Sequence, residues 1–340
     1  MLFGHGDDFS NVMLQANFSS NVWYGADVEL LKTHLFQKFA SLTRYPEPDA
    51  ASLKQQLASF YGISSENLLV TNGSITAFYL IAQTWAGARS TILIPSFAEY
   101  EDACTLYEHR IRYVSNEEPL LKLSLAGQTL CWICNPNNPD GRLWSRAEMV
   151  ALLQAYPETF FVVDQAYVEF VESEGLIPAD VQTYPNLLLV RSISKVHKIP
   201  GLRIGYLVAS PEIIARLQSY LIPWSVNALA LEAGKYVLQH PESFVLPLSK
   251  WHHDTAVLQA ALAEFSGLDV FPTKTTFFLV RLKKGCAAEL KRFLLDEYKI
   301  LIRDASNFRG LDETYFRLST QSPEANCHLL YALRTWFERT

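Results

Sequence analysis

The sequence has no long apolar run and no surplus of positive charge, and these two absences exclude whole classes of protein. Nowhere in the 340 residues do about 18 apolar residues follow one another, so no segment is long enough for a transmembrane helix. The first residues show no basic region followed by an apolar stretch, so we expect a cytoplasmic protein without a membrane partner. The formal net charge of −6 argues against a nucleic-acid partner, because nucleic-acid-binding surfaces are basic.

Cysteine is also scarce. The five cysteines are scattered and odd in number, which excludes a disulfide framework. Cys131 and Cys134 have the spacing of a redox or metal-binding pair. They lie inside an apolar segment typical of a strand, and no second pair follows, so we interpret them as buried free thiols and expect no metal site.

What the sequence does contain is apolar material for a large core. Hydrophobic residues make up 49% of a chain that is long enough for about two domains. In the first half, strand-like and helix-like segments alternate, which predicts an α/β fold with a mostly parallel sheet that binds ligands beyond the carboxyl ends of its strands. The expected strands are 67–71, 90–94, 111–115, 130–134, 159–164, 186–191 and 202–209, and the expected helices are 27–42, 50–61, 74–85, 98–107 and 145–155.

The pattern changes after residue 211. Helices are expected at 229–239, 243–265, 286–298 and 323–338, and strands at 267–271, 276–282, 300–303 and 315–320. These segments predict a smaller α+β domain. We therefore expect an N-terminal arm over the active site (1–25), a large domain (26–225) and a small C-terminal domain (226–340).

A lysine lies in the loop between two of the expected strands. Lys195 follows the hydroxyl residues Ser192 and Ser194, and Arg203 follows beyond the Pro200-Gly201 turn. Hydroxyls, an ammonium and a guanidinium can converge on one small anion. This grouping suits a cofactor that carries both a phosphate and an aldehyde, with Lys195 as its Schiff-base partner.

A second anion-binding turn follows the strand at 67–71. Gly73 allows a ligand to approach closely, and the free backbone amides of Ser74 and Ile75 open the next helix. These amides can hold a phosphate at the positive end of the helix.

Ser192-x-Ser-Lys195 followed by Gly201-Leu-Arg-x-Gly-Tyr206 resembles the pyridoxal-phosphate (PLP) site of the class I and II aminotransferase family. The resemblance implies the PLP-dependent transferase fold and PLP as cofactor. It assigns the phosphate to the Gly73 turn, ring stacking to Phe97, the phenolic oxygen to Asn138 and Tyr167, and the protonated ring nitrogen to Asp164.

Within this family, Tyr45-Pro-Glu-Pro48 is similar to a segment of histidinol-phosphate aminotransferases. There the tyrosine reaches the PLP phosphate of the neighbouring subunit. The similarity implies a homodimer with shared active sites.

Other stretches resemble the threonine-phosphate decarboxylases, which share the fold: His5-Gly6, Phe18 to Asn21, Pro95 to Tyr100, Ile199 to Arg203 and Ile300 to Leu311. The chain departs from them at Trp23-Tyr24, where Asn-Pro is usual. By this resemblance Arg317 clamps the substrate's α-carboxylate, while Arg303 and His5 meet its phosphate. The implied substrate is a phosphorylated amino acid.

The expected function is thus PLP-dependent decarboxylation of L-threonine O-3-phosphate to (R)-1-aminopropan-2-yl phosphate, a step of cobalamin biosynthesis. The alternative is an aminotransferase acting on histidinol phosphate or a related amino acid. A non-catalytic protein that keeps the fold for binding is disfavoured, because Lys195, Asp164, Asn138 and Arg203 are all present.

Overall fold

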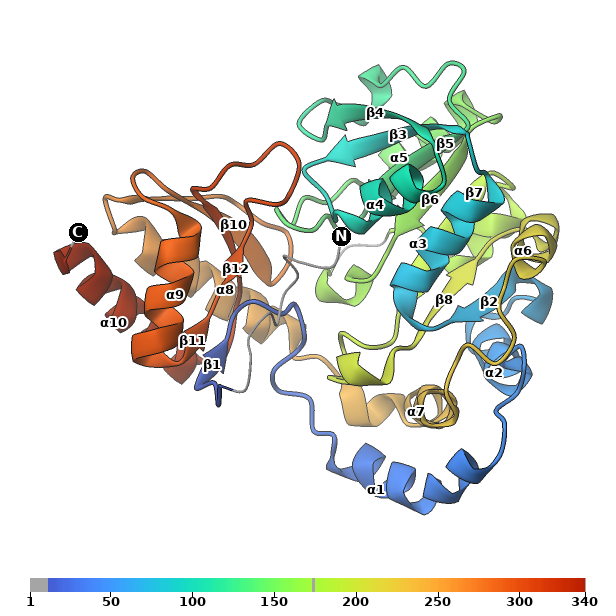
Figure 1. Ribbon diagram of the computed structural model, residues 1–340, viewed down its shortest axis with the longest axis horizontal. Coiled ribbons are helices and arrows are strands. Elements are labelled where there is room, and N and C mark those ends of the chain that lie inside the picture. Colours follow the sequence, from blue (N-terminus) through green and yellow to red (C-terminus); the bar gives the residue numbers. More distant parts are fainter. Residues whose placement is uncertain (1–11, 173–174, 340) are drawn as a thin grey trace.

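The computed structural model describes residues 12–172 and 175–339, which form a large unit around a seven-stranded sheet and a smaller unit around a four-stranded sheet (Figure 1). The order in the large sheet is β2-β8-β7-β6-β5-β3-β4. Its pairs are parallel except those of β8, which runs antiparallel to both neighbours. The strands are β2 (Leu68–Thr71), β3 (Arg89–Ile94), β4 (Arg110–Ser115), β5 (Leu130–Cys134), β6 (Phe160–Asp164), β7 (Leu187–Ser192) and β8 (Gly205–Val208).

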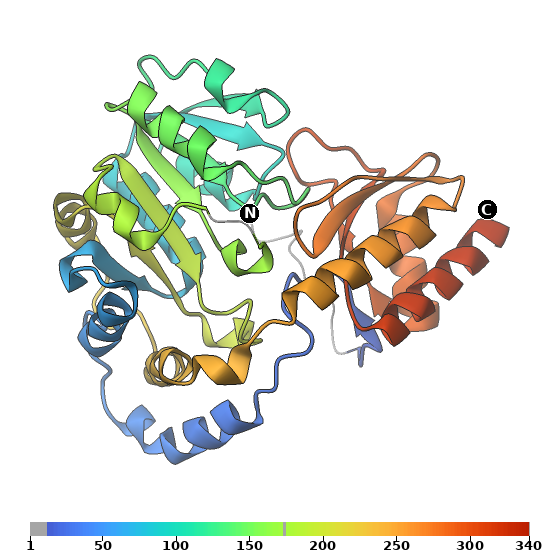
Figure 2. The same ribbon diagram turned by 180° about the vertical axis from the view of Figure 1, so that it is seen from behind.

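Helices cover both faces of this sheet, so its central strands are apolar throughout. Alternate residues of β5 enter different cores: Ile133 joins one cluster and Trp132 the other. The first face carries α2 (Ala51–Tyr61), α5 (Arg146–Ala155) and α7 (Ala228–Gln239), and the second carries α3 (Gly73–Thr84), α4 (Glu99–Leu106) and α6 (Pro211–Gln218) (Figures 1 and 2). The expected mostly parallel α/β architecture is confirmed.

The smaller unit is an antiparallel sheet with helices packed on it. Its order is β12-β13-β10-β9, with β9 (Leu268–Val270), β10 (Phe277–Leu282), β12 (Arg303–Asp304) and β13 (Tyr315–Ser319). The helices are α8 (Leu248–Ala263), α9 (Ala287–Tyr298) and α10 (Pro323–Arg339). The described end of the arm joins this unit, because β1 (Ala16–Asn17) pairs in parallel with β11 (Ile300–Leu301).

The core of the large unit continues beyond residue 225. α1 (Glu29–Gln37) packs on α7, and Ala230 and Val237 of α7 belong to the same buried cluster as Leu53 of α2. The division into three segments stays a prediction.

Some expected boundaries were wrong for local reasons. Residues Pro200–Leu202 form a 3-10 turn and Arg203 is left-handed (φ 58°), so β8 begins at Gly205 and not at 202. The helix expected at 243–265 begins only after Pro247. The helix α6 was not foreseen, although Ser210 caps it and a proline begins it.

Candidate active site

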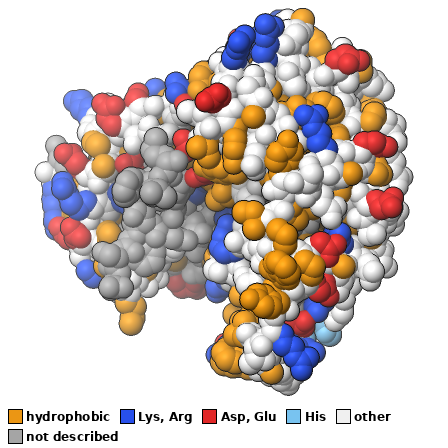
Figure 3. Space-filling view, turned by 45° about the vertical axis from the view of Figure 1, so that its right-hand side comes forward, with side chains coloured by type: hydrophobic (Ala, Val, Ile, Leu, Met, Phe, Trp, Pro, Cys, Tyr) orange, Lys and Arg blue, Asp and Glu red, His pale blue; other side chains and the backbone are white. Residues whose placement is uncertain are grey.

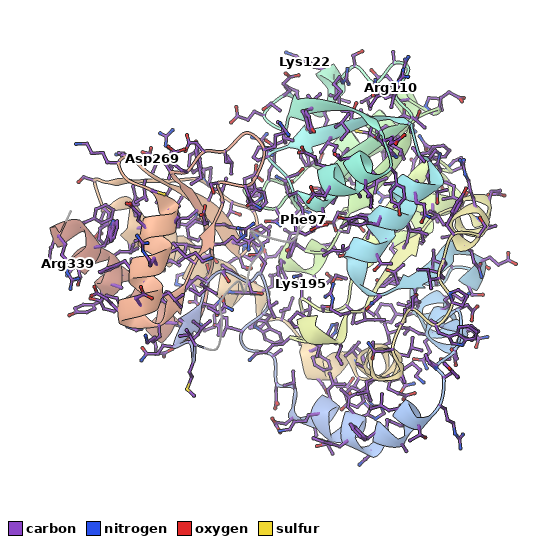
Figure 4. The ribbon with its side chains drawn as sticks, in the orientation of Figure 1. Phe97, Arg110, Lys122, Lys195, Asp269 and Arg339 are labelled. Atoms are coloured by element: carbon purple, nitrogen blue, oxygen red, sulfur yellow. The ribbon has the colours of Figure 1, made fainter. Side chains whose placement is uncertain are left out.

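Most of the predicted site residues line one cleft of about 350 Å³. In Figure 4, Lys195 and Phe97 lie on the side of the large unit that faces the small unit. Parallel strands end at the same edge of the sheet, which is why loops far apart in sequence meet here. The lining residues are Ser19, Ser20, Asn21, Ser74, Ile75, Phe97, Asn138, Asp164, Ala166, Tyr167, Ser192, Ser194, Lys195, Arg203, Arg303, Phe308 and Arg317.

The turn after β7 presents Lys195 to the cleft. The Ser194 amide donates a hydrogen bond to Oγ of Ser192 (3.3 Å), and Nζ of Lys195 lies 5.9 Å from the centre of the Tyr167 ring. The arm supports this turn from outside, because the Trp23 amide donates to the Lys195 carbonyl oxygen (3.0 Å). Trp23, where the threonine-phosphate decarboxylases usually have another residue, thus places a buried indole beside the loop that carries Lys195.

An anion cradle surrounds the start of α3. The Cβ of any larger residue at Gly73 would overlap Nη2 of Arg203, and a Cβ at Gly205 would lie 2.7 Å from the Ser74 amide nitrogen. The absence of side chains at both glycines therefore lets the guanidinium and the helix amides come together. Nη1 of Arg203 is held by the Pro200 carbonyl (2.9 Å). This donor set fits a phosphate group.

Asp164 ends β6 and is 4% exposed. Its Oδ1 accepts a hydrogen bond from the Ala166 amide (2.9 Å) and its Oδ2 accepts one from the Tyr100 hydroxyl (2.5 Å). Burial raises the pKa of Asp164 to about 6, while the Tyr100 hydrogen bond and the Lys195 charge act in the opposite direction. A buried carboxylate in this state is suited to pair with a cationic ring nitrogen.

Tyr100 is a site residue that the sequence reasoning missed. The segment Pro95 to Tyr100 carries part of the resemblance to threonine-phosphate decarboxylases, but the resemblance assigns a role there only to Phe97. Tyr100 does not line the cleft, but its hydroxyl reaches Asp164 across 64 positions of sequence. The available signal in the sequence was a tyrosine three residues after Phe97, the expected ring-stacking residue.

The slot between these groups suits an aromatic ring. Phe97 lines one side, and its ring lies edge-on to Tyr100 (5.9 Å between centres). Tyr167 packs edge-on against Phe277 (4.9 Å), and burial raises its pKa, so its hydroxyl stays protonated. Together with the anion cradle and Asp164, this slot fits a phosphate-bearing pyridine ring.

Arg317 brings three parts of the chain together at the other side of the cleft. From β13 its Nη1 donates to Oδ1 of Asn138, and its Nη2 donates to the Ser19 carbonyl oxygen (2.5 Å). The side chain is buried. A guanidinium held in this way can receive a carboxylate with its planar fork.

Arg303 is a second buried guanidinium in the same cleft. Its Nη1 donates to the Asp304 carbonyl and its Nη2 to Oδ1 of Asn307 (2.7 Å). Its Cζ lies 5.2 Å from the centre of the Phe308 ring. The loop after β12 therefore fixes its direction before a ligand binds.

The arm supplies side chains to the cleft that the sequence reasoning did not assign. Ser19, Ser20 and Asn21 all line it. Asn21 is 2% exposed. The resemblance at Phe18 to Asn21 was the available signal for these residues.

One predicted residue, Tyr45, does not line the cleft of its own chain. Tyr45 is 89% exposed and packs on the ring of Trp224 (5.8 Å), away from the cleft of its own chain. This position leaves its expected contact with a neighbouring subunit a prediction. His5 lies outside the described residues.

Cys131 and Cys134 are buried free thiols, as expected. Burial raises the pKa of both, so neither is a ready thiolate. Across residues 12–172 and 175–339, no three His, Cys, Asp or Glu side chains come together as a metal site would require. None of the helices in that part of the chain is long and apolar enough to cross a membrane.

Known proteins resemble the chain over almost its whole length. Residues 14–333 match the family model of aminotransferase class I and II. The crystal structure of L-threonine-O-3-phosphate decarboxylase from Porphyromonas gingivalis has 49% sequence identity and a TM-score of 0.94, covering 95% of this chain and 99% of that one. The threonine-phosphate decarboxylase of Salmonella typhimurium is 32% identical over 94% of this chain and 90% of its own. The histidinol-phosphate aminotransferase of Symbiobacterium thermophilum is also 32% identical, over 87% and 83%.

Proposed function

Because the chain belongs to the family of class I and II aminotransferases, we propose that it is a PLP enzyme that decarboxylates L-threonine O-3-phosphate to (R)-1-aminopropan-2-yl phosphate. One observation carries the choice of substrate: the buried guanidinium groups of Arg303 and Arg317 line the same cleft as Lys195. A phosphorylated amino acid has two anionic groups, and two separate guanidinium groups match them.

The residues that would hold PLP fall into three groups. Its phosphate would bind the α3 amides and the side chains of Ser192, Ser194 and Arg203. Asp164 would pair with the ring nitrogen, and Phe97 would stack on the ring. The phenolic oxygen would be bound by Asn138 and Tyr167, and the Lys195 amine would hold the aldehyde.

Orientation of the substrate decides which bond breaks. Bound PLP withdraws electrons from Cα of the substrate, and it weakens the bond that stands perpendicular to its ring. Arg317 on the carboxylate and Arg303 on the phosphate would fix the bond to the carboxylate in this direction. CO2 then leaves, and Nζ of Lys195 is placed to deliver the proton that Cα takes up.

The alternative is transamination of histidinol phosphate, which the similarity to the Symbiobacterium thermophilum enzyme supports. Histidinol phosphate carries a phosphate but no carboxylate. It would therefore leave one of the two guanidinium groups without an anion, which favours the decarboxylase.

The deciding experiment supplies PLP and compares two substrates. With O-phospho-L-threonine alone we expect CO2 release and an amine product, without a keto acid. With L-histidinol phosphate and 2-oxoglutarate we expect no glutamate. Glutamate formation together with no CO2 release would reverse the assignment. A protein that binds PLP but turns over neither substrate would support the non-catalytic alternative.

We also propose a homodimer, supported by exposed apolar side chains on and near α1. Figure 3 shows hydrophobic side chains gathered over the lowest part of the molecule, where α1 lies in Figure 1. Such a patch is typical of a protein–protein interface. The exposed residues in and just after α1 are Leu30, Phe36, Phe39, Leu42 and Tyr45, and the exposed Trp224 packs on Tyr45. Sedimentation at micromolar concentration tests this assembly, and a monomer would contradict it.

The cytoplasm is the proposed compartment, and cobalamin biosynthesis is the proposed pathway. All five cysteines are free thiols, which suits a reducing compartment. The similarity to threonine-phosphate decarboxylases supports the pathway.

A further inference from the structure

We propose that Tyr100 is a positioning residue, which keeps the Asp164 carboxylate charged and directed toward the ring nitrogen of the cofactor. This inference rests on the proposed function. Its basis is the 2.5 Å hydrogen bond from the Tyr100 hydroxyl to Oδ2 of Asp164. Both side chains are buried, and Tyr100 does not line the cleft. Tyr100 would therefore act on the cofactor only through Asp164.

An aromatic cluster fixes the position of the Tyr100 hydroxyl. The Tyr100 ring stacks on Trp132 (5.8 Å between centres, 23° between planes). Phe78 packs edge-on against it at 4.8 Å, and Phe97 does so at 5.9 Å. Because Phe97 lines the cleft, the same cluster contacts the slot for the cofactor ring and holds the donor to Asp164. The hydroxyl is thus preorganised and needs no rearrangement when a ligand binds.

Among the described residues, we identify four groups that face the Asp164 carboxylate. Besides Tyr100 these are the Ala166 amide, which donates to Oδ1 at 2.9 Å, the Cys134 thiol and the nearby Lys195 ammonium. The thiol lies 3.9 Å from Oδ2 and is closer to the Pro136 carbonyl (3.2 Å), so it is a weak donor to Asp164. When Lys195 binds an aldehyde, its nitrogen becomes part of an imine and is no longer a free ammonium. With the cofactor in place, the Tyr100 hydroxyl is therefore the main side-chain donor that we identify on this carboxylate.

The hydrogen bond opposes the effect of burial. Burial alone favours the neutral carboxyl, and the pKa of Asp164 is raised to about 6; the Tyr100 hydrogen bond is the first of the influences that lower it. Burial and the charge of Asp164 raise the pKa of Tyr100 well above its ordinary value, so the phenol stays protonated and remains a donor. A neutral Asp164 would not stabilise a protonated ring nitrogen, and the cofactor would then withdraw fewer electrons.

The variant Tyr100→Phe removes the hydroxyl and keeps the ring in its cluster. A hydrogen bond to a charged group contributes enough that we expect PLP to bind the apoprotein about tenfold more weakly. A less protonated ring withdraws less charge from the imine nitrogen, so the pH midpoint of the visible absorption band should move upward. Both quantities are measured by PLP titration, without any assay of turnover.

Tyr79→Phe is the matched control. The Tyr79 hydroxyl also donates to a buried carboxylate, Oε2 of Glu99, at 2.8 Å, but neither residue lines the cleft. This variant should leave the PLP affinity and the band unchanged. A double-mutant cycle supplies the second test: in an Asp164→Asn background, Tyr100→Phe should weaken PLP binding less than twofold, because the carboxylate that it acts on is gone.

Three results would overturn the role of Tyr100. One is an unchanged band and affinity in Tyr100→Phe, and another is an equal loss in the wild-type and Asp164→Asn backgrounds. The third is a Tyr100→Phe apoprotein that does not fold, which would make the residue structural. A wild-type protein that develops no visible band with PLP would instead refute the proposed function, so the two failures are distinguishable.

Discussion

Arg317 donates a hydrogen bond to Oδ1 of Asn138 across 179 positions of sequence. Arg317 belongs to the small sheet, and Asn138 to the loop after β5 of the large sheet. In the proposed enzyme, Arg317 binds the substrate carboxylate and Asn138 contacts the cofactor. The bond therefore connects the two ligand sites directly, and it fixes where the carboxylate lies relative to the ring.

Arg303 bonds its own loop, through the Asp304 carbonyl and Oδ1 of Asn307, and it is the residue to test for substrate choice. Loss of two charge-assisted hydrogen bonds in Arg303→Ala should lower kcat/KM for O-phospho-L-threonine about 100-fold. The same variant should change the KM for unphosphorylated L-threonine less than threefold. Arg317→Ala is the matched control and should lower kcat/KM for both substrates by similar factors. Equal losses for both substrates in Arg303→Ala would refute its role at the phosphate.

Lys195→Ala should remove the visible absorption band of the PLP-loaded protein and lower turnover about 1000-fold or more, because the amine both holds the aldehyde and moves the proton. Lys198→Ala is the control in the same turn. Its ammonium is exposed and bonds the Tyr24 carbonyl (2.7 Å), so that variant should stay yellow. A yellow Lys195→Ala protein with normal turnover would remove the basis of the proposed function.

Gly73→Ala tests the anion cradle. Gly73 has a φ of +77° and its missing Cβ leaves room for Arg203, whereas Gly62 has a φ of +65° with nothing within 4 Å. Alanine at either position strains the backbone by roughly 1 kcal/mol. Only Gly73→Ala should also displace the guanidinium and weaken PLP binding about tenfold. Equal PLP affinities in Gly73→Ala and Gly62→Ala would mean that Arg203 does not need this space.

The sequence was most informative where local chemistry and topology coincide. Ser192 ends an apolar strand, Ser194 and Lys195 follow it closely, and Asp164 ends another apolar strand. Parallel pairing of β6 and β7 brings these ends to one edge of the sheet, so residues far apart in sequence line one cleft. The residues at these two strand ends could therefore be predicted to meet in one site.

The sequence was least informative where a contact depends on side-chain packing between elements. The Tyr100 hydroxyl contacts the Asp164 carboxylate only because α4 packs beside the sheet. No local sequence pattern predicts this contact. Asn21 enters the cleft because β1 pairs with β11 of the small unit. A strand of two residues is too short to be predicted from the sequence pattern. The later start of β8 follows from the left-handed Arg203, a conformation that is unusual for arginine.

Mixed dimers test whether active sites are shared. Tyr45 is exposed and distant from the cleft of its own chain, so a neighbouring subunit would have to use it. Lys195→Ala and Tyr45→Ala should each be strongly impaired as pure proteins. When both are co-expressed, half of the dimers are mixed and each mixed dimer has one intact site, so about a quarter of wild-type activity should return. Activity that remains at the level of the separate variants would contradict a shared site.

The stability of the apoprotein should depend on pH through Asp164. Burial raises its pKa from 3.8 to about 6, so between these values the folded state binds more protons than the unfolded state. The free energy of unfolding should therefore fall as pH rises through this window, by up to about 3 kcal/mol, and this contribution should be absent in Asp164→Asn. Denaturant unfolding of both apoproteins at pH 4.5, inside this window, and at pH 7, about one unit above it, measures how the free energy of unfolding changes. Asp269→Asn is the control. The partly exposed Asp269 pairs with Arg281, which lowers its pKa, so this variant should parallel the wild type between pH 4.5 and 7. Parallel curves for wild type and Asp164→Asn would show that the buried carboxyl is already charged without a cofactor.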